Sequence, residues 1–527
     1  MILIRNLRLG TDEAIGALPE KAAKKLRIAP ERIESWQLVK KSLDARKKDD
    51  LHYVCAVAAE IRGSVRVKDR DVSDYVPPRY EIPRIAASSR PVVVGFGPAG
   101  MFAALVLAKA GARPIVLERG QDAPTRLAAV EAFRAGGRLD AENNVQFGEG
   151  GAGTFSDGKL NTGTHDPRLH WVLAQFAAHG APESVRYDAK PHIGTDVLVD
   201  VVQSIRREIV ALGGEVRFGA KLTGLAVEDG RVAGAVVNGE ETLPCEALIL
   251  AIGHSARDTF EALLAQGVRM EPKPFSMGVR IEHRQERVDL AQYGRARGSL
   301  PAADYALNVH LPDGTSAYTF CMCPGGEVFA AASEEGGVVT NGMSHAARAG
   351  ENANAALLVT LHAEDFPGEG VLRGMVWQRE LERRAFVLGG GNYHAPAQRA
   401  GDFLAHRPSE GPGTVRPSYR PGVTWTDLHE LLPARITDVL EQAIPALGKK
   451  LRGFDDPDAV LTAPETRSSS PVRILRGKNC EAAIRGLYPC GEGAGYAGGI
   501  TSAAVDGLRC AEAVLREIRN SEFGIRN

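Results

Sequence analysis

One stretch, residues 90–120, limits the possible folds of this chain more than any other. A buried apolar strand at residues 92–94 leads into a glycine turn and a helix of small residues at about 99–110. A second buried strand at 115–117 then ends at Glu118. A strand, a helix and a parallel strand in this order make a βαβ unit. Its glycines at 95, 97 and 100 have the GxGxxG spacing of dinucleotide-binding folds.

Each part of this motif has a physical task in holding a dinucleotide. Gly95 permits the tight turn, Gly97 lets the backbone approach a pyrophosphate, and Gly100 lets the helix pack closely on the strand. Free N–H groups at the helix N-terminus favour a diphosphate. The Glu118 carboxylate can accept hydrogen bonds from both hydroxyls of an adenosine ribose. It would repel a 2′-phosphate, so NADP is disfavoured at this site.

Length, charge and composition limit the number of domains and the class of partner. The chain has 527 residues, too many for one core, so two or three domains are expected. Its net charge of −1 gives no reason to expect nucleic acid or an anionic membrane as the partner. The uncharged run at 92–108 contains glycines and a proline and is slightly short for a membrane span, so we expect it in a soluble core.

The first residues and the cysteines favour a cytoplasmic protein. Residues 1–5 have the pattern of a strand and not of a signal peptide. The seven cysteines are irregularly spaced, without the paired spacing of zinc ligands. We therefore predict a reducing compartment and no metal site.

The order of elements predicts an α/β chain with three domains. Residues 1–85 form a small α+β domain, with strands at 2–9, 33–41 and 51–61 and a helix at 18–26. A Rossmann-like domain occupies 86–269, is interrupted by an antiparallel, β-rich substrate domain at 270–460, and is completed by 461–527. Lysine and arginine concentrate in the N-terminal domain, which is either a docking module without chemistry or a site for a protein or RNA partner.

Two more glycine-rich segments are candidates for cofactor contact. Residues 143–159 contain five glycines and either lie against a cofactor or form a surface loop; the candidate residues there are Gly150, Gly151, Gly153, Thr154 and Lys159. Residues 486–507 form a second strand, glycine turn and helix, the helix extending from about 501 to 518. The candidates in that turn are Gly491, Glu492, Gly493, Gly499 and Ile500.

Other parts of the chain carry weaker signals. A buried strand at 245–252 ends at Gly253, which we expect to approach the cofactor, and His254 beside it suits a structural role as well as a catalytic one. Antiparallel strands are expected at 275–282, 305–311, 317–322 and 328–332, and a helix at 425–447. Residues 389–424 are rich in glycine and proline, so they form either a lid or a surface excursion.

Together these motifs resemble the FAD-dependent oxidoreductases of the glutathione-reductase-like superfamily. The resemblance implies that a GxGPAG turn and the acid after the second strand hold the ADP half of FAD. It also implies that a C-terminal Gly-(Asp/Glu)-Gly segment holds the ribityl chain and the ring. The matching residues are Gly95, Gly97, Pro98, Ala99, Gly100, Glu118 with its neighbour Arg119, and Gly491, Glu492 and Gly493.

A narrower resemblance covers nearly the whole chain. Residues 145–160, 320–326 and 464–473 are similar to bacterial proteins described as FAD-dependent or NAD(FAD)-utilising dehydrogenases, a description that implies no particular substrate. The sequence has neither a second GxGxxG nor the CxxxxC pair of disulfide reductases. NAD(P)H, as an electron donor, would therefore bind only transiently at the flavin face.

Four side chains are candidates for the chemistry. Cys321 and Cys323 share one face if they lie in a regular strand, so both thiols could meet one ligand; the alternative is that they are small buried hydrophobic residues. Lys159 and Arg467 would balance the charge of a reduced flavin, bind a substrate carboxylate, or be solvated surface charges.

These observations predict an FAD-dependent oxidoreductase that transfers hydride through flavin N5 to or from a small organic substrate under the antiparallel sheet. An FAD-dependent monooxygenase is the enzymatic alternative. A binding protein that keeps the fold and the cofactor without turnover is the alternative from another class. The sequence does not identify the substrate.

Overall fold

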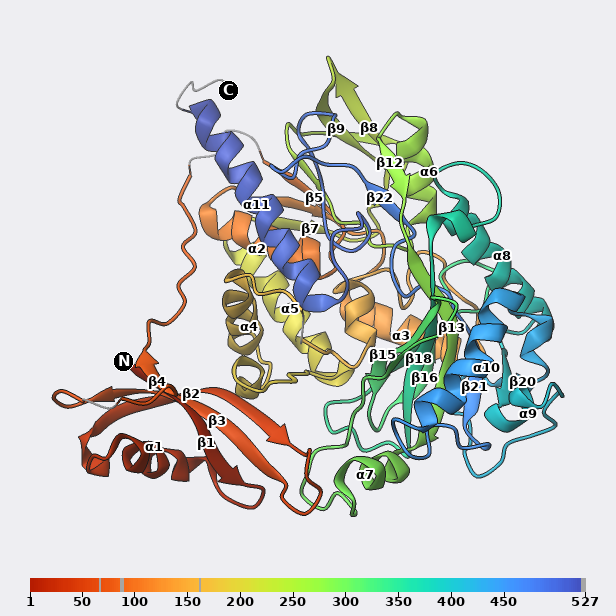
Figure 1. The fold of residues 1–527 in the computed structure, drawn as a ribbon. Helices are drawn as coiled ribbons and strands as arrows, with labels where there is room; N and C mark the ends of the chain where they lie inside the picture. The colour runs from red at the N-terminus through yellow and green to blue at the C-terminus, as the bar shows by residue number, and fades with distance from the viewer. Residues whose placement is uncertain (66–67, 86–89, 161–162, 523–527) are drawn as a thin grey trace.

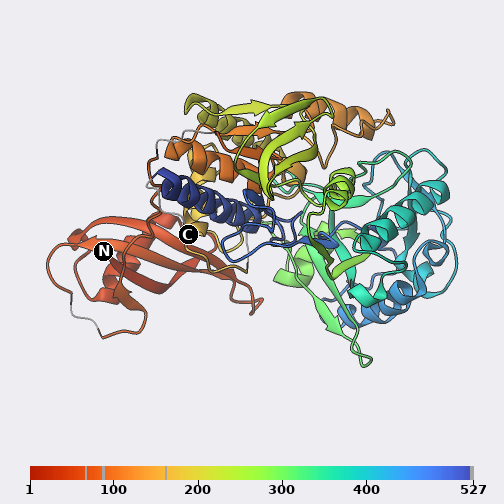
Figure 2. The same cartoon turned by 90° about the horizontal axis from the view of Figure 1, so that it is seen from above.

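The computed structural model describes residues 1–65, 68–85, 90–160 and 163–522, arranged as three bodies (Figure 1 and Figure 2). A small N-terminal domain lies to one side and is joined to the rest by an extended segment. A parallel sheet with its helices and a larger, mostly antiparallel sheet form the other two bodies. The long C-terminal helix α11 (Ile500–Glu522) runs beside the parallel sheet.

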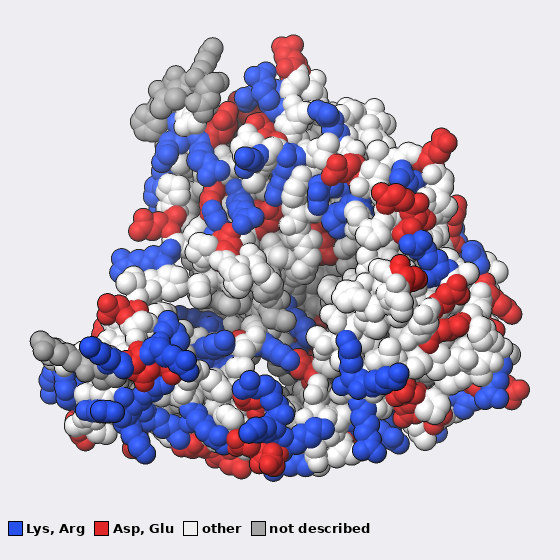
Figure 3. All heavy atoms as spheres, viewed as in Figure 1, with Lys and Arg blue, Asp and Glu red and all other residues white. Residues whose placement is uncertain are grey.

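The N-terminal domain is a four-stranded antiparallel sheet with one helix. The strand order is β2-β3-β1-β4, formed by β1 (Ile2–Gly10), β2 (Ile33–Asp44), β3 (His52–Ile61) and β4 (Val72–Asp74). Helix α1 (Leu18–Leu26) buries Leu18, Ala22 and Leu26, because a spacing of four residues places them on one helix face. Lysine and arginine side chains gather over this domain, with acidic side chains among them (Figure 3).

The predicted βαβ unit is present in a five-stranded parallel sheet. Its order is β23-β11-β5-β6-β7, and the unit itself is β5 (Val92–Val94), α2 (Pro98–Ala110) and β6 (Ile115–Leu117). One face of the sheet packs on α2, α11, α4 (Arg168–Ala178) and α5 (Thr195–Ala211). The other face packs on α6 (Arg257–Ala265) and on a small sheet of order β10 (Glu241–Pro244), β9 (Arg231–Val237) and β8 (Leu222–Glu228). The remaining strands of this sheet are β7 (Glu215–Arg217), β11 (Leu248–Leu250) and β23 (Leu487–Pro489).

Strands β11 and β23 are hydrogen-bonded neighbours although more than two hundred residues separate them in the sequence. Every strand of the second large sheet lies in that interval. This is the topology expected of an insertion, and the domain boundaries given above remain predictions.

The second large sheet has seven strands in the order β14-β15-β18-β13-β21-β19-β20. Its centre is β13 (Phe275–Arg284) paired with β18 (Asn352–Leu361), and almost every residue of both is buried. Alternation along β13 places Met277, Val279 and Ile281 in the apolar core under α10 (Ala434–Gly448). Arg280 and Glu282 project from the opposite face.

Three expectations about this region are corrected. Residues 389–424 are neither a lid nor a plain loop, because they contain β19 (Ala395–Arg399), which is part of the large sheet, and α9 (Ala400–Leu404). The helix expected from residue 425 begins only at residue 434, directly after Pro433. The strand expected at 245–252 is reduced to the three residues of β11.

Among the described residues, no helix is both long enough and apolar enough to cross a bilayer.

The remaining elements complete the frame around the site. The other helices are α3 (Ala123–Arg134), α7 (Gln285–Tyr293) and α8 (Arg373–Leu388). The other strands are β12 (Met270–Pro272), β14 (Asn308–His310), β15 (Ser316–Cys323), β16 (Glu327–Ala330), β17 (Thr340–Met343), β20 (Val423–Trp425), β21 (Val460–Glu465) and β22 (Val472–Ile474).

Candidate functional site

A cavity of about 470 Å³ lies where the parallel sheet meets the seven-stranded sheet. This volume is within the range of small-molecule and cofactor sites. Its wall contains the glycine turn after β5, the end of β6, the loop after β11, the turn before α11 and the ends of β15 and β17. The carboxyl ends of parallel strands are the usual ligand side of such a sheet, so the cavity lies where the sequence motifs predict a dinucleotide.

The three glycines of the turn differ in the space that a side chain would find at each position. Gly95 has φ +94°, and a Cβ there would lie 2.3 Å from the Ala251 carbonyl oxygen. A Cβ on Gly100 would lie 1.9 Å from the Gly95 carbonyl oxygen, so both glycines are required by packing within the protein. Gly97 is the residue before α2 and has an ordinary extended backbone. A Cβ on Gly97 would lie 3.6 Å from its nearest neighbour, the Gly151 Cα. Gly97 therefore leaves open space on the cavity wall for a ligand.

Glu118 stands at the end of β6 and is buried in the cavity wall. Its carboxylate accepts hydrogen bonds from three backbone N–H groups: Phe96 at 2.8 Å, Gly120 at 2.9 Å and Gly148 at 2.8 Å. These bonds fix the acid beside the glycine turn. Arg119 also lines the cavity, and its guanidinium lies over the Phe147 ring and pairs with Glu142 and Asp258.

The glycine-rich loop at 143–159 is ordered by an arginine that sequence reasoning missed. Arg126 of α3 is fully buried and donates to the carbonyl oxygens of Asn144, Val145 and Glu149. The loop then forms a short 3₁₀ turn, Gly151–Phe155, against the first glycine turn. A Cβ on Gly151 would lie 2.7 Å from the Gly97 Cα. The loop is thus packed against the predicted cofactor turn and lines the cavity.

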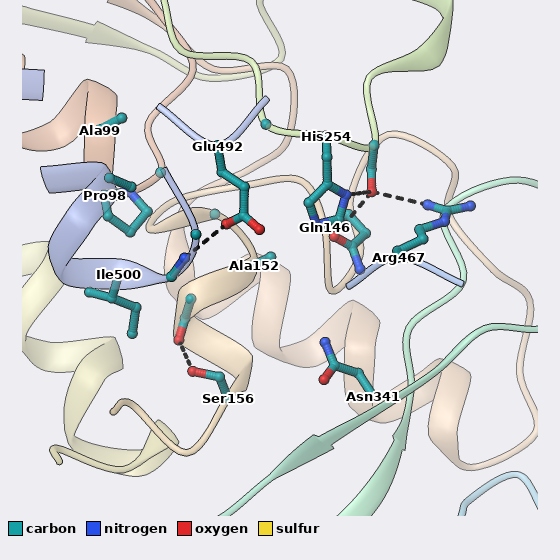
Figure 4. A pocket seen from close by; sticks show the side chains of 18 of the residues that line it. Pro98, Ala99, Gln146, Ala152, Ser156, His254, Asn341, Arg467, Glu492 and Ile500 are labelled. Atoms are coloured by element: carbon teal, nitrogen blue, oxygen red, sulfur yellow. Dashed lines mark hydrogen bonds between the residues drawn. The ribbon is translucent and has the colours of Figure 1, made fainter. Parts of the chain in front are cut away.

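The turn before α11 closes another side of the cavity (Figure 4). Glu492 and Ile500 face the space from this segment, and the Glu492 Oε2 accepts a hydrogen bond from the Gly499 N–H at 3.3 Å. Burial raises the pKa of Glu492 to about 7. Gly493 packs against the loop after β11, since a Cβ there would lie 2.3 Å from the Gly253 carbonyl oxygen.

A buried charge network supports the wall around His254; of its members, Arg467 is labelled in Figure 4. Arg467 makes two hydrogen bonds to the Glu382 carboxylate, at 2.9 and 2.7 Å, and Arg257 makes two more, at 2.8 and 2.9 Å. Burial alone would raise the pKa of Glu382, but the two guanidinium groups hold it below its usual value. Arg467 also donates to the hydroxyls of Ser255 and Ser333. Its polar atoms are therefore used within the protein.

His254 projects into the cavity as a neutral imidazole. Burial and the nearby Arg467 and Arg257 charges lower its pKa to about 3. Its Nδ1 lies 3.0 Å from the Ser255 hydroxyl, which in turn lies 3.2 Å from the Gln146 side-chain oxygen. This chain of polar contacts fixes the side chains on one side of the space in Figure 4.

Cys321 and Cys323 both line the cavity, but not through regular strand alternation. A register shift in β15 lies between Phe320 and Cys323, and Cys321 has φ +40°. As a result, Cys321 is exposed while Cys323 is buried. The Arg280 guanidinium lies 3.5 Å from the Cys323 sulfur and donates to the Cys321 carbonyl oxygen at 2.8 Å.

Most of the predicted site residues come together at this cavity. Those that line it are Gly95, Gly97, Pro98, Ala99, Glu118, Arg119, Gly151, Gly153, Lys159, Gly253, Cys321, Cys323, Arg467, Glu492, Gly499 and Ile500. The other predicted site residues do not line the cavity: Gly100, Gly150, Thr154, Gly491 and Gly493. Thr154, for example, is buried and directs its hydroxyl to the Glu149 carbonyl oxygen at 3.3 Å.

Several lining residues were not among the candidates named from the sequence. Gln146, Tyr305, Asn341 and Glu465 belong to four different segments and match no spacing rule. Glu465 is the partner of the buried Arg280, at 3.1 Å, and burial raises its pKa to about 7. A polar residue inside an otherwise apolar strand, as at Arg280, was the one available hint.

Family models match two parts of the chain. Residues 274–468 match the model described as "FAD-dependent protein, C-terminal domain-like". Residues 1–60 match a domain of unknown function, DUF8436. The first match covers the seven-stranded sheet and its side of the cavity. It supports the predicted FAD dependence from a region that lies outside the glycine motifs.

A protein of Clostridium beijerinckii, described as uncharacterised, is 48% identical over 531 residues, covering 98% of this chain and 99% of that protein. Among solved structures, a mutant of the flavin-dependent brominase Bmp2 has a TM-score of 0.39 at 14% identity, covering 82% of this chain and 81% of that chain. Glycine oxidase from Bacillus cereus has a TM-score of 0.30 at 11% identity, covering 82% and 96%. TM-scores below 0.5 are too low to assign a function.

Proposed function

This chain belongs to the same family as the Clostridium beijerinckii protein, and we propose that it is an FAD-dependent oxidoreductase acting on a small organic substrate. The observation that carries the proposal is the single cavity onto which both glycine turns, the 143–159 loop and the ends of β15 and β17 converge. The match of residues 274–468 to FAD-dependent proteins supports it independently.

The residues of the cavity fit the two halves of FAD. Gly97 offers a wall without a side chain, and the first turn of α2 offers backbone N–H groups with no side-chain cap, which suits a pyrophosphate. Glu118 is held beside this turn by three backbone N–H groups, which leaves one acceptor position, on Oε2, for a ribose hydroxyl. Gly151, Gly153 and the first turn of α11 would hold the flavin end.

Bound FAD would supply a ring that accepts or returns hydride at N5. The protein contributes the surroundings of that ring. The N-terminus of α11 carries a partial positive charge, which favours the negative charge that a flavin gains on reduction. The neutral His254 adds a polar group without adding charge. The substrate side of the cavity is bounded by Tyr305, Cys321 and Asn341.

NADH or NADPH is the proposed electron donor, bound transiently at the flavin face. We also propose a cytoplasmic location, because all seven cysteines are free thiols.

The test is an anaerobic visible spectrum of the purified protein, recorded before and after addition of NADH and then NADPH. We expect the absorbance band of oxidised flavin at the start, and its bleaching by one of the two nucleotides. A bound flavin that neither nucleotide bleaches would refute the donor but keep FAD. A colourless protein that does not take up added FAD would contradict the proposal as a whole.

A further inference from the structure

One cation on the cavity wall has no hydrogen-bond partner. The Lys159 Nζ is buried, and among the described residues none accepts a hydrogen bond from it. Its nearest carboxylate oxygen is the Asp157 Oδ2, at 3.5 Å. That carboxylate already accepts two hydrogen bonds from the Arg348 guanidinium, which pairs with it in the buried wall. The Asp157 carboxylate is therefore bound mainly by Arg348, and it offsets the positive charge of Lys159 only in part.

The charges around Lys159 sum to a positive excess. Three cations, Lys159, Arg348 and Arg280, face two carboxylates, Asp157 and Glu465, along this wall. Burial raises the pKa of Glu465 to about 7, so near neutral pH it offers only part of a negative charge. Two more lysines line the cavity, and both are paired: Lys190 with Asp304 at 2.7 Å and Lys221 with Glu142 at 2.7 Å. A buried positive excess is costly unless an anion offsets it.

Tyr305 supplies a second unused donor on the same wall. Its side chain is buried and lines the cavity, and its hydroxyl has no hydrogen-bond partner among the residues that the structure describes. Burial raises the pKa of the Cys323 thiol on this wall, and the Arg280 and Lys159 charges oppose that shift. Unpaired buried donors are rare in proteins and indicate a missing partner.

We propose that this wall binds the carboxylate of an organic acid substrate, with Lys159 as its ion pair and Tyr305 as its hydroxyl donor. The assignment deepens, and rests on, the proposed function, because it places the charged end of the substrate where the rest of the molecule would reach the flavin. A carboxylate has the charge that the wall lacks and two oxygens for two donors.

Cys321 provides a local probe for this site. It is the one exposed thiol of the seven, and it lies on the same wall as Lys159. The FAD-loaded protein is alkylated in parallel with iodoacetate, which carries a carboxylate, and with iodoacetamide, its neutral analogue. Both reagents attack the same thiolate, so the ratio of their rates does not depend on the thiol pKa. The ratio is compared with that of glutathione under the same conditions.

We expect the iodoacetate-to-iodoacetamide ratio at Cys321 to exceed that of glutathione by about tenfold or more, the effect of one charge-assisted contact. Lys159→Met is expected to abolish the excess, Lys159→Arg to keep it, and Tyr305→Phe to reduce it. Lys190→Met is the matched control, because that lysine already has a partner. Cys321→Ser identifies the labelled peptide by mass spectrometry.

The assignment would be overturned by a ratio equal to that of glutathione, or by an excess that survives in Lys159→Met. An excess in the FAD-free protein that disappears on FAD loading would also overturn it, because the lysine would then serve the flavin. Should Lys159→Met fail to fold, benzoate and benzyl alcohol are added to the wild-type protein. Benzoate alone must slow iodoacetamide labelling. Flavin content, measured on every sample, separates failure of this site from failure of FAD binding.

Discussion

At the scale of single residues, Gly97 and Gly100 separate cofactor binding from folding. Gly97→Ala adds a methyl group that the protein accommodates, at 3.6 Å from its nearest neighbour, but that projects toward the proposed pyrophosphate. We expect an unchanged unfolding midpoint without FAD and an FAD affinity lowered by about tenfold or more, from the lost backbone approach. FAD titration and chemical unfolding of the FAD-free protein measure the two effects.

Gly100→Ala is the matched variant with the opposite outcome. Its Cβ would lie 1.9 Å from the Gly95 carbonyl oxygen, so α2 must shift on the sheet. We expect a loss of stability of about 1 to 3 kcal/mol, as for other overpacked cores. If Gly97→Ala destabilises the FAD-free protein as much as Gly100→Ala does, the open wall at Gly97 has been misinterpreted.

Glu282 gives stability a dependence on pH. It is fully buried in β13, and burial raises its pKa to about 7, above its ordinary value of 4.5. Between these two values the folded state holds a proton that the unfolded state has lost, so the free energy of unfolding falls as pH rises. The contribution is complete below about pH 4.5 and is lost as pH passes 7.

We expect the free energy of unfolding to fall by about 2 to 3 kcal/mol more in the wild type than in Glu282→Gln between pH 5 and pH 8. Urea unfolding at the two pH values measures the difference. Glu286→Gln in the first turn of α7 is the control, because it is the same substitution at a side chain that is exposed instead of buried. Parallel pH profiles for wild type and Glu282→Gln would contradict the assignment.

At the scale of elements, the first turn of α11 is expected to tune the flavin. Ser502 lies in that turn and lines the cavity. In Ser502→Asp, a new negative charge opposes the charge that a flavin gains on reduction, whereas Ser502→Asn has the same shape without charge. A helix-terminal charge effect of about 1 kcal/mol corresponds to a reduction potential lower by roughly 20 mV in the Asp variant.

Spectroelectrochemical titration of the two variants tests this expectation. The Asn variant corrects for loss of the hydrogen bonds between Ser502 and Gly498, which both substitutions disturb. Equal potentials in the two variants would indicate that the flavin ring does not meet this helix end.

At the scale of the whole molecule, the N-terminal domain is separate from the cavity. Every lining residue falls between Val94 and Ala503. The domain touches the rest through limited contacts, such as the backbone bonds of Lys41 with Tyr187 and Ala189, and Lys48 with the Ala291 carbonyl oxygen. Small interfaces of this kind are typical of domains that fold independently.

We therefore expect a chain truncated to residues 75–527 to retain one FAD per chain and the same FAD affinity. Its stability should fall modestly, because Leu43 and Leu51 pack on the core of the seven-stranded sheet. Flavin content and thermal unfolding of the truncated chain measure both. Loss of FAD on truncation, with the remainder still folded, would assign the N-terminal domain a part in cofactor binding.

The local units of this protein can be predicted from its sequence. Periodicity and backbone geometry within short windows predict four of them: the βαβ unit, helix α1, the C-terminal strand, turn and helix, and the glycines at 95 and 100. For the same reason, many of the residues that line the cavity near the glycine turns could be named in advance, since each belongs to a contiguous motif.

Which distant groups meet depends on how the whole chain folds. Three contacts join segments that no sequence motif links: the pairing of β11 with β23, the Arg257–Glu382–Arg467 network and the loop held by Arg126. The positive φ at Cys321 and the register shift of β15 come from pairing with β18, not from the strand's own sequence. Local hydrogen bonding is encoded within a window of a few residues. A cavity wall depends on chain closure over hundreds of residues, which no local pattern records.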